Sequence, residues 1–303
     1  MLSVLTFNIW FDELNRNERL FSLINVIQKN SPDIICLQEV IYETYEILKN
    51  ILKEYTYFYP NKLELSYGCV IFSKHIMTQT YDKVYPETQM GRNLIAINIV
   101  YNSINITIAT SHFESIFGLI NTTKTSQYIH AMKLLNKLYD IGSPVIFCSD
   151  TNILPSEERY FFKDILWVDA YNEVNFDSHQ EKQWNNYTYD TKHNTNLIKR
   201  NIKILPSRID RIVYRGGSTL TVIKFKLVGK FQKDDIITNS IKEKTKYTFI
   251  DVEDIINKKV DIHMEQILIE QSNQKLEINT DIEPSDHFGV LVHFEITNNE
   301  IHI

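Results

Sequence analysis

The sequence predicts an α/β layer fold, and three features of the chain support this expectation. In the N-terminal part, short β-branched and aromatic runs alternate with segments whose apolar residues recur at helical spacing. The middle of the chain is rich in strand-like runs. The 303 residues are 43% hydrophobic and 23% charged, which is enough apolar sequence for one large core.

The N-terminal part predicts a strand, a helix, a strand and a helix in turn. Each expected helix has one apolar face, and Ser31-Pro32 stops the first of them. The first strand ends at Asn8 and the second at Gln38-Glu39. The expected elements are a strand over 4–7, a helix over 20–27, a strand over 34–37 and a helix over 45–52.

The rest of the chain predicts more strands, one long helix and an insertion. Residues 101–103 form a short hairpin connection, and 172–207 are polar and irregular. Without a Pro/Gly linker or a repeat, we expect one domain over residues 1–303, with an insertion at about 229–282 that carries a short helix near 251–258. The remaining expected elements are strands over 69–72, 94–100, 104–109, 145–147, 209–214 and 290–294, and a helix over 128–138.

The composition argues against several classes of protein. The net charge of −6 gives no global sign of a nucleic-acid binder, so any basic surface is local. Cys36, Cys69 and Cys148 lie in apolar runs without the spacing of a zinc site, and we expect buried free thiols. No apolar run approaches the roughly 20 residues of a membrane span, and the first residues do not resemble a signal peptide. We expect an intracellular protein, cytoplasmic or nuclear, that is not secreted and has no membrane partner.

Polar residues follow strand after strand. Any one of them has an ordinary explanation as a helix cap or a turn residue. Their repetition favours a site, because ligands of open α/β sheets bind at the carboxyl ends of strands. These residues are Asn8, Glu39, His112, Asp150, Asn152, Asp210, Asp286 and His287.

The residue types indicate metal-assisted phosphodiester hydrolysis. A carboxylate such as Glu39, with amide groups nearby and no Cys or His-pair motif, suits a hydrated Mg²⁺ ion. Asp150 is placed to orient or deprotonate a water. His112, His287 and Asn152 can surround phosphoryl oxygens. Asp286, beside His287, can help to hold an imidazolium over developing negative charge.

Five short motifs in order resemble those of the endonuclease/exonuclease/phosphatase superfamily. They are Thr6-Phe-Asn8, Leu37-Gln-Glu-Val40, Thr110-Ser-His112, Ser149-Asp-Thr-Asn152 and Ser285-Asp-His287. Within the superfamily the sequence is most similar to the 5′-tyrosyl-DNA phosphodiesterases. This narrower resemblance depends on Met90-Gly-Arg-Asn-Leu94, Thr110-Ser-His-Phe-Glu-Ser115, Tyr187-Thr-Tyr-Asp-Thr-Lys192 and Arg208-Ile-Asp-Arg-Ile212.

The resemblance implies a DNase I-like four-layer α/β sandwich, in which two packed β-sheets are flanked by helices. It implies that Glu39 is the Mg²⁺ ligand, with Asn8 close to the metal and the phosphate and Mn²⁺ as a possible substitute ion. Asp150 would position the attacking water, and Asn152 would bind the phosphate. His287, paired with Asp286, would stabilise the pentavalent phosphorus. The implied reaction is hydrolysis of the bond between a protein tyrosine and a DNA 5′ end, leaving a 5′-phosphate.

The resemblance also implies a set of substrate contacts. His112 and Ser115 would touch the phosphate, and Tyr189 would stack on the terminal base in place of a family Trp. Ile209 would form the opposite apolar wall in place of a family Phe. Arg92 and Tyr67 also belong to the implied substrate-binding set. The implied partner is a single-stranded or frayed DNA 5′ end that carries a tyrosyl adduct, bound by a monomer.

Three positions depart from the family pattern. Trp10 stands where the family carries a further carboxylate, although Asp12 is close by. Phe117 and Leu154 stand near the places of two arginines that contact phosphate. Losing two guanidinium groups weakens the expected grip on a charged backbone.

Several other functions fit parts of the same pattern. A general Mg²⁺-dependent nuclease or an abasic-site endonuclease shares the chemistry, and so does a lipid or inositol phosphatase. An RNA 5′-phosphotyrosyl adduct is an alternative substrate, because the sequence does not show what reads the 2′-hydroxyl. A scaffold that kept the fold and only binds a partner is the alternative to an enzyme.

Overall fold

The structure is a computed structural model that describes residues 1–115, 122–140, 143–158, 161, 164–173, 186–202, 204–230 and 282–297. The insertion expected at 229–282 lies outside the described residues except at its two ends, and so does its expected helix near 251–258. No helix of the described ranges combines the length and apolar character needed to cross a membrane.

The first sheet has six strands in the order β11-β12-β1-β2-β4-β3. Strand β1 lies inside it, parallel to β2 and antiparallel to β12. All seven residues of β1 are buried because both faces of the sheet are covered. The strands are β1 (Leu2–Asn8), β2 (Ile34–Ile41), β3 (Tyr57–Tyr59), β4 (Tyr67–Ser73), β11 (Leu220–Val228) and β12 (Gly289–Ile296).

The second sheet also has six strands, in the order β5-β6-β7-β8-β10-β9. Strand β8 lies inside it, parallel to β7 and antiparallel to β10. The strands are β5 (Met77–Val84), β6 (Asn93–Tyr101), β7 (Ile104–His112), β8 (Val145–Asp150), β9 (Val168–Asp169) and β10 (Asp210–Arg215).

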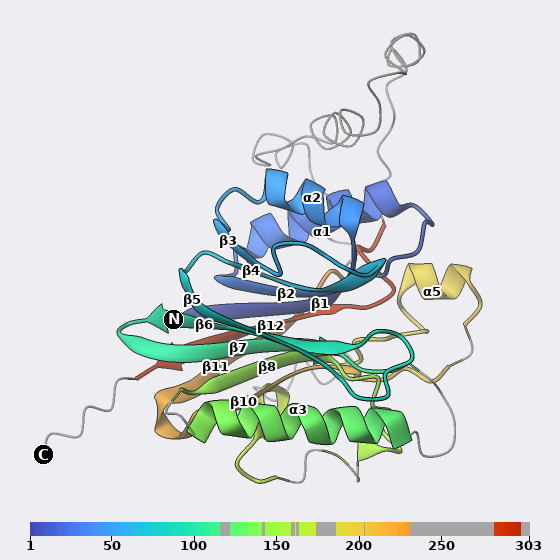
Figure 1. Cartoon of the computed structure of the whole chain (residues 1–303). Helices are drawn as coiled ribbons and strands as arrows, with labels where there is room; N and C mark the ends of the chain where they lie inside the picture. The colour runs from blue at the N-terminus through green and yellow to red at the C-terminus, as the bar shows by residue number, and fades with distance from the viewer. Residues whose placement is uncertain are drawn as a thin grey trace, which may run out of the picture.

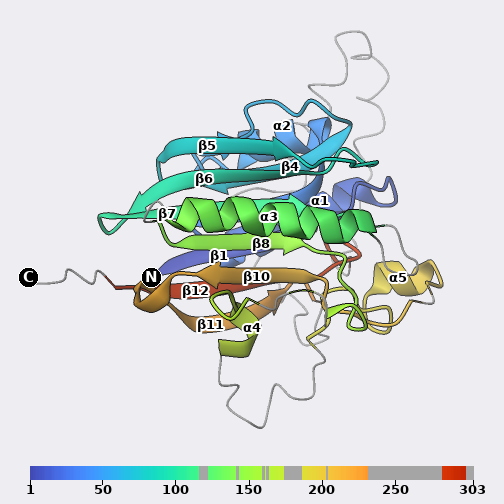
Figure 2. The same ribbon diagram turned by 60° about the horizontal axis from the view of Figure 1, so that its bottom comes forward.

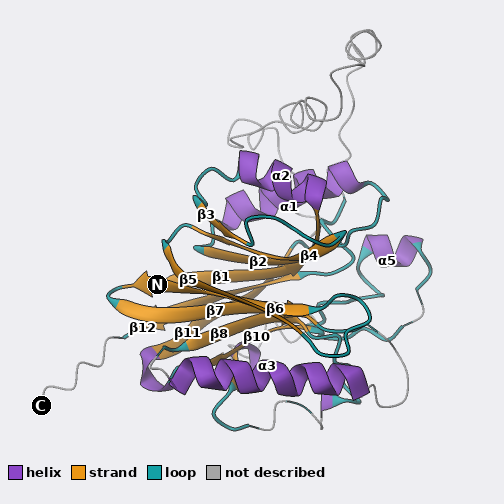
Figure 3. Ribbon diagram, in the orientation of Figure 1, coloured by secondary structure: helices purple, strands orange, loops and turns teal. Residues whose placement is uncertain are grey.

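The two sheets pack face to face, and helices cover their outer faces (Figures 1 and 3). Isoleucines of β2 and β4 meet those of β6, β7 and β8 in the core between the sheets. Helices α1 (Arg16–Asn30) and α2 (Tyr42–Ile51) pack on the first sheet. Helix α3 (Thr122–Asp140) packs on the second and runs along β7 and β8 in Figure 2. The predicted four-layer sandwich is confirmed.

A buried glutamine connects the sheets close to the edge at which the polar residues gather. The Nε2 group of Gln38 donates to Thr6 Oγ1 at 3.0 Å within the first sheet. It also donates to Thr110 Oγ1 at 2.9 Å in the second sheet. All three side chains are fully buried, and hydrogen bonds are stronger in such a low-dielectric environment. These bonds therefore help to hold the two sheets together at this edge.

Most of the expected elements are present, and one expected boundary is wrong. Strand β2 does not end at Gln38-Glu39 but continues to Ile41, with a register shift between Leu37 and Val40. The 101–103 hairpin is confirmed, and Asn102 and Ser103 both have positive φ, as a type I′ turn requires. The elements that the sequence pattern missed include β3, β5, β9, β11, α4 (Ala170–Glu173) and α5 (Thr195–Lys199).

Candidate active site

Strand register brings the polar strand ends to one edge of the sandwich. Asn8 is the last residue of β1, His112 of β7 and Asp150 of β8. In the second sheet His112 and Asp210 lie directly beside Asp150 on its two sides. In the first sheet Val290 of β12 pairs with Thr6 of β1, so the loop that precedes β12 lies beside the end of β1. Eight predicted residues therefore reach one edge from strands far apart in sequence.

The irregularity in β2 directs Glu39 into this edge. Glu39 has φ of 60°, a left-handed conformation that is uncommon for a residue with a side chain. It coincides with the register shift in β2, and bulges of this kind re-aim side chains next to active sites. The carboxylate is held on both sides, because Asn8 Nδ2 donates to Oε1 at 3.2 Å and the backbone N–H of Phe11 donates to Oε2 at 3.1 Å.

Asn8 links the carboxylates of the two sheets. Its Oδ1 accepts the backbone N–H of Trp10 at 3.0 Å, which fixes the orientation of the amide. Its Nδ2 donates to Asp150 Oδ2 at 2.8 Å as well as to Glu39. Asn8 thus presents its NH₂ group to the carboxylates, and this orientation favours a place beside the metal over direct ligation.

His112 is a neutral imidazole held between Arg92 and Asp150. Because an arginine can only donate, the contact of 2.8 Å between Arg92 Nη1 and His112 Nδ1 leaves the ring proton on Nε2. That Nε2 lies 3.2 Å from Asp150 Oδ2 and 3.9 Å from Glu39 Oε1. Burial, assisted by the Arg92 charge, lowers the pKa of His112 well below its ordinary value.

His287 forms a buried pair with Asp210. Its Nδ1 lies 2.8 Å from Asp210 Oδ2, and its Nε2 lies 3.9 Å from Asp150 Oδ2 and 3.8 Å from Asp286 Oδ1. The hydrogen-bonded carboxylate is thus Asp210, which strand register places beside Asp150, while Asp286 faces the other ring nitrogen as an ion-pair partner. Burial by itself lowers the pKa of His287, but the carboxylates of Asp210 and Asp286 outweigh it and raise the pKa well above its ordinary value.

Two carboxylates of the site are destabilised as anions. Burial raises the pKa of Asp150 to about 7, and the adjacent Asp210 carboxylate acts in the same direction. Burial also raises the pKa of Asp286 to about 6. Such concentrated negative charge in a buried place is typical of a site that receives a cation.

Asn152 follows Asp150 in a second left-handed conformation, with φ of 49°. Its backbone N–H donates to Asp150 Oδ1 at 3.0 Å, and its Nδ2 donates to the carbonyl of Phe113 at 3.1 Å. Lys124 from α3 donates to the Asn152 carbonyl at 2.8 Å and pairs with Glu157. The turn after β8 is therefore fixed by polar contacts on both of its sides.

Most of these groups line an open cleft of about 180 Å³. Its lining combines carboxylates, imidazoles and Asn152 with apolar and aromatic side chains. The ring of Tyr189 lies edge-to-face with that of His287 at 5.2 Å between centroids. The lining residues are Trp10, Phe11, Glu39, His112, Ser115, Asp150, Asn152, Leu154, Tyr189, Ile204, Ser207, Ile209, Asp286 and His287.

Comparison with known proteins agrees with this arrangement. The sequence matches the Endonuclease/Exonuclease/phosphatase family over residues 5–287, which includes every motif of the cleft. The chain belongs to the endonuclease/exonuclease/phosphatase family.

Two relatives in this family carry the same name. Tyrosyl-DNA phosphodiesterase 2 of Xenopus tropicalis is 33% identical over 225 residues, covering 71% of this chain and 56% of the relative. The protein of that name from Homo sapiens is 28% identical over 225 residues, covering 72% of this chain and 59% of the relative. The chain thus spans less than two thirds of the length of these relatives.

Solved structures of the family share the fold. The structure of D. rerio TDP2 complexed with single strand DNA product superposes with a TM-score of 0.69 at 20% identity and covers 97% of this chain and 98% of that one. Truncated Caenorhabditis elegans TDP2 gives a TM-score of 0.67 at 18% identity, covering 97% of this chain and 96% of that one.

Four of the six predicted substrate-binding residues line the cleft of this family member, and the other two contact residues that line it. The four that line it are His112, Ser115, Tyr189 and Ile209. Arg92 is only 5% exposed, does not line the cleft, and reaches it through His112. Tyr67 stacks on Phe11 at 4.7 Å between ring centroids and so supports a residue that does line the cleft.

The departures from the family pattern also have definite places. Trp10 and Leu154 line the cleft, whereas Asp12 is drawn away from it by an ion pair with Arg200 at 2.6 Å. Phe117 lies outside the described residues. The family carboxylate is thus replaced by an aromatic surface.

Helix α5 supports the loop that carries His287, a role that the sequence did not indicate. Asn194 and Asn196 each donate from Nδ2 to the carbonyl of Ser285 at 2.9 Å, and Asn196 also donates to the carbonyl of Glu283. Thr195 donates from its backbone N–H and its hydroxyl to the Glu283 carboxylate. A cluster of Asn and Thr before a short apolar run is the only signal of this helix in the sequence.

The donor set fits a divalent cation, on which members of this family generally depend. Asp150, Asp210 and His287 offer ligand atoms within 4.8 Å of one another. His287 and Asp210 already hydrogen bond to each other, however, which occupies one atom of each. Glu39 keeps 14% of its side chain exposed in the cleft, and oxygen ligands of this kind suit a hard cation.

Proposed function

We propose that this protein is a Mg²⁺-dependent phosphodiesterase that hydrolyses the 5′-phosphotyrosyl bond between a protein tyrosine and a DNA 5′ end, leaving a 5′-phosphate. The name shared by its relatives supports the substrate, and Mn²⁺ is a suitable substitute ion. The observation that carries the proposal is the meeting of Asn8, Glu39, His112, Asp150, Asn152, Asp286 and His287 at one open cleft.

In this proposal Glu39 holds the cation, and Asn8 lies beside it. A bound Mg²⁺ ion supplies charge that neutralises phosphoryl oxygens. Asn8 Nδ2 donates to both Glu39 and Asp150, so it keeps the cation ligand and the water-handling carboxylate at a fixed separation. Fixed placement of such groups is where much of the rate enhancement of phosphoryl transfer arises.

Asp150 orients the attacking water and accepts its proton. The raised pKa of Asp150, about 7, makes it a stronger base than an ordinary aspartate. Its Oδ1 is held by the Asn152 N–H, whereas Oδ2 faces Asn8 and His112. The carboxylate therefore has a single orientation toward the cleft.

His287 and its neighbours bind the phosphoryl group as negative charge develops. Asp210 keeps the imidazole protonated and directs Nε2 toward the cleft, with Asp286 assisting from the other side. His112, Asn152 and Ser115 supply further contacts to phosphate oxygens. A tyrosine leaves as a phenolate whose conjugate acid has a pKa of about 10, so it departs more readily than a sugar alkoxide. A dedicated general acid is correspondingly less important.

The apolar and aromatic side chains of the cleft suit an unpaired terminal nucleotide. Tyr189 offers a ring on which any base can stack, and Ile209 and Leu154 add apolar surface to the same cleft. Stacking on a single base requires a single-stranded or frayed end. Tyr67 and Arg92 support the other side of the cleft through Phe11 and His112. Because all of these groups belong to one chain, we expect a monomer. The DNA substrate named for its relatives supports action inside the cell, in the nucleus or cytoplasm.

Four substrates test the proposal. The purified protein is incubated in Mg²⁺, and then in EDTA, with a 5′-phosphotyrosyl DNA oligonucleotide, its RNA counterpart, an abasic duplex and an unmodified single strand. We expect release of tyrosine and a 5′-phosphate end from the DNA adduct, abolished by EDTA. Cleavage confined to the abasic duplex, or faster turnover of the RNA adduct, contradicts the proposed substrate.

A further inference from the structure

Arg19 is a buried cation whose described hydrogen-bond partners are all backbone carbonyls. The side chain lies on α1 and is 1% exposed. Its guanidinium donates to the carbonyls of Ile9, Trp10, Asp12 and Leu14. Burial lowers its pKa to about 10, which leaves it charged at neutral pH. Burying such a group is costly unless its donors are satisfied, and the loop over residues 9–14 satisfies them by wrapping around it.

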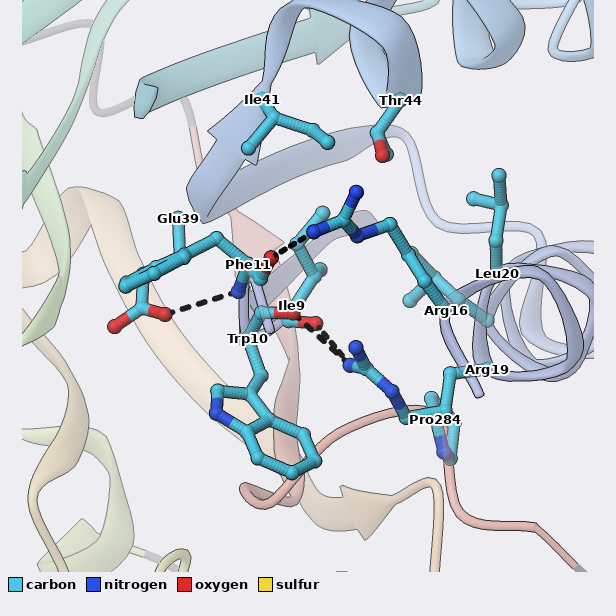
Figure 4. A pocket seen from close by; sticks show the side chains of 11 residues that line it. Ile9, Trp10, Phe11, Arg16, Arg19, Leu20, Glu39, Ile41, Thr44 and Pro284 are labelled. Atoms are coloured by element: carbon cyan, nitrogen blue, oxygen red, sulfur yellow. Dashed lines mark hydrogen bonds between the residues drawn. The ribbon is translucent and has the colours of Figure 1, made fainter. Parts of the chain in front are cut away.

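The same loop supplies two N–H donors to the polar groups of the cleft. The N–H of Trp10 donates to Asn8 Oδ1, and the N–H of Phe11 donates to Glu39 Oε2. Figure 4 shows Arg19 on one side of the loop and Glu39 on the other, with the backbone of residues 9–11 between them. The guanidinium and the Glu39 carboxylate are thus connected through one short piece of backbone.

This piece of backbone is in a strained conformation. Trp10 has φ of 58°, a left-handed conformation that is strained for a residue with a side chain and persists only where the surrounding structure imposes it. Arg19 Nη1 bonds the carbonyls on both sides of that strained residue, Ile9 O and Trp10 O, each at 3.0 Å. The guanidinium also lies 4.5 Å from the centroid of the Trp10 ring.

We infer that Arg19 is a positioning residue that holds the 9–14 loop so that its N–H groups fix the orientation of Asn8 and Glu39 for the cation. The inference rests on the proposed function in taking Glu39 as the carboxylate that binds the cation. A guanidinium is required, because a lysine ammonium cannot span four carbonyls from one fixed plane. Partners of this kind, which orient a ligand without touching the metal, change metal affinity by about 10- to 100-fold.

Arg200 provides a matched control, because its guanidinium also lies over the Trp10 indole. Its guanidinium lies 4.8 Å from the Trp10 ring centroid and pairs with the Asp12 side chain. Its side chain is 41% exposed, and its contacts leave the carbonyls of residues 9 and 10 to Arg19. Removing Arg200 therefore removes a stacked cation but not the support of the strained backbone.

Calorimetric titration with Mg²⁺ alone, on the full chain without substrate, tests the inference. We expect Arg19→Gln to raise the Kd for Mg²⁺ by about tenfold or more, Arg19→Lys to restore little of this loss, and Arg200→Gln to stay close to wild type. Hydrogen exchange at the amides of Trp10 and Phe11 should become faster in both Arg19 variants. If Arg19→Gln proves not to be folded, as judged by a non-cooperative unfolding transition, the Arg19→Lys variant tests the inference instead. Wild-type Mg²⁺ affinity and wild-type amide protection in Arg19→Lys would overturn the inference.

A further variant separates this inference from the proposed function. Glu39→Gln should abolish the calorimetric signal if Glu39 holds the cation. Unchanged Mg²⁺ binding in that variant contradicts the proposed metal placement. If Glu39→Gln loses the ion while a folded Arg19→Gln binds it with wild-type affinity, only the positioning role of Arg19 fails.

Discussion

Asp150 is in contact with polar side chains from both sheets. It accepts from Asn8 of the first sheet and lies 3.2 Å from His112 of the second. Asp210 faces it across the ladder, and His287 reaches it from the loop before β12. Burial, together with the adjacent Asp210 carboxylate, raises the pKa of Asp150, and its contacts with both sheets make it the most informative single residue to change.

Asp150→Asn should leave the fold intact and abolish turnover. The amide keeps the shape of the side chain but cannot accept a proton from water, and general-base groups contribute roughly 100- to 10,000-fold. Single-turnover cleavage of a 5′-phosphotyrosyl oligonucleotide measures the loss, and circular dichroism checks the fold. Asp82→Asn, at an exposed position of β5, is the control. Activity close to wild type in Asp150→Asn would remove Asp150 from the mechanism.

Tyr189→Leu should raise KM more than it lowers kcat. The substitution keeps an apolar wall but removes the ring, and stacking is worth about 1–3 kcal/mol per base. We expect KM to rise by roughly five- to 100-fold for single-stranded adducts, whatever the terminal base. Tyr42→Leu, at an exposed position of α2, serves as the control. An effect confined to kcat would mean that Tyr189 acts by supporting the His287 ring and not by stacking on the nucleotide.

At the level of elements, the loop before β12 depends on the short helix α5. Three consecutive residues, Asn194, Thr195 and Asn196, are hydrogen bonded to residues 283–285. The loop then reaches His287, whose backbone N–H donates to Ser285 Oγ. The orientation of the imidazole is therefore set by an element some ninety positions earlier in the chain.

Asn196→Ala should destabilise the protein and slow the reaction together. It removes two buried hydrogen bonds, at about 1 kcal/mol each, and leaves the carbonyls of Glu283 and Ser285 less satisfied. Urea unfolding should show a loss of roughly 2–3 kcal/mol. The kcat for the phosphotyrosyl substrate should fall while KM changes little. Lower stability with an unchanged kcat would mean that α5 does not position His287.

The sequence pattern predicted the strands that are buried on both faces, but not the exposed or very short elements at the edges of the sheets. The runs around Ile34, Ile97 and Ile146 are almost entirely apolar, as strands between two layers require. Strand β5 has a polar, largely exposed sequence and was missed, as was α5, which spans only five residues. The bulge at Glu39 escaped prediction because it depends on pairing with β4, a tertiary contact.

The candidate site was predictable as a set of residues but not as a set of contacts. The strand-end pattern identified Asp150, His112 and Asp210 as members. It did not identify Asp210 as the hydrogen-bond partner of His287, because that contact depends on the ladder between β8 and β10, whereas Asp286 is adjacent to His287 along the chain. Arg19 was invisible to the motif pattern, since its partners are backbone carbonyls.

For the whole molecule, the concentrated carboxylates predict a pH-dependent stability in the absence of metal. The folded-state pKa of Asp286 is raised to about 6, so the stabilisation that its protonated form contributes is fully present below about pH 4 and is lost as pH rises through about 6. A shift of about two pKa units corresponds to roughly 3 kcal/mol.

Urea unfolding in EDTA, measured from about pH 4 to pH 7, tests this prediction. The free energy of unfolding of Asp286→Asn should decline with pH by roughly 3 kcal/mol less than that of wild type. Added Mg²⁺ should stabilise the wild-type protein most at the upper end of this range, because the cation offsets the buried anions. If the free energies of unfolding of the two proteins changed with pH in parallel, Asp286 would not be a source of the pH-dependent destabilisation.

In the proposed function, this cleft hydrolyses the bond between phosphorus and the tyrosine oxygen at a DNA 5′ end. Mass spectrometry of the products formed in water enriched in the heavy oxygen isotope tests it most directly. With Mg²⁺ and a 5′-phosphotyrosyl oligonucleotide, we expect one heavy oxygen in the 5′-phosphate and unlabelled free tyrosine. An adduct that stays intact while internal phosphodiester bonds are cut would contradict it.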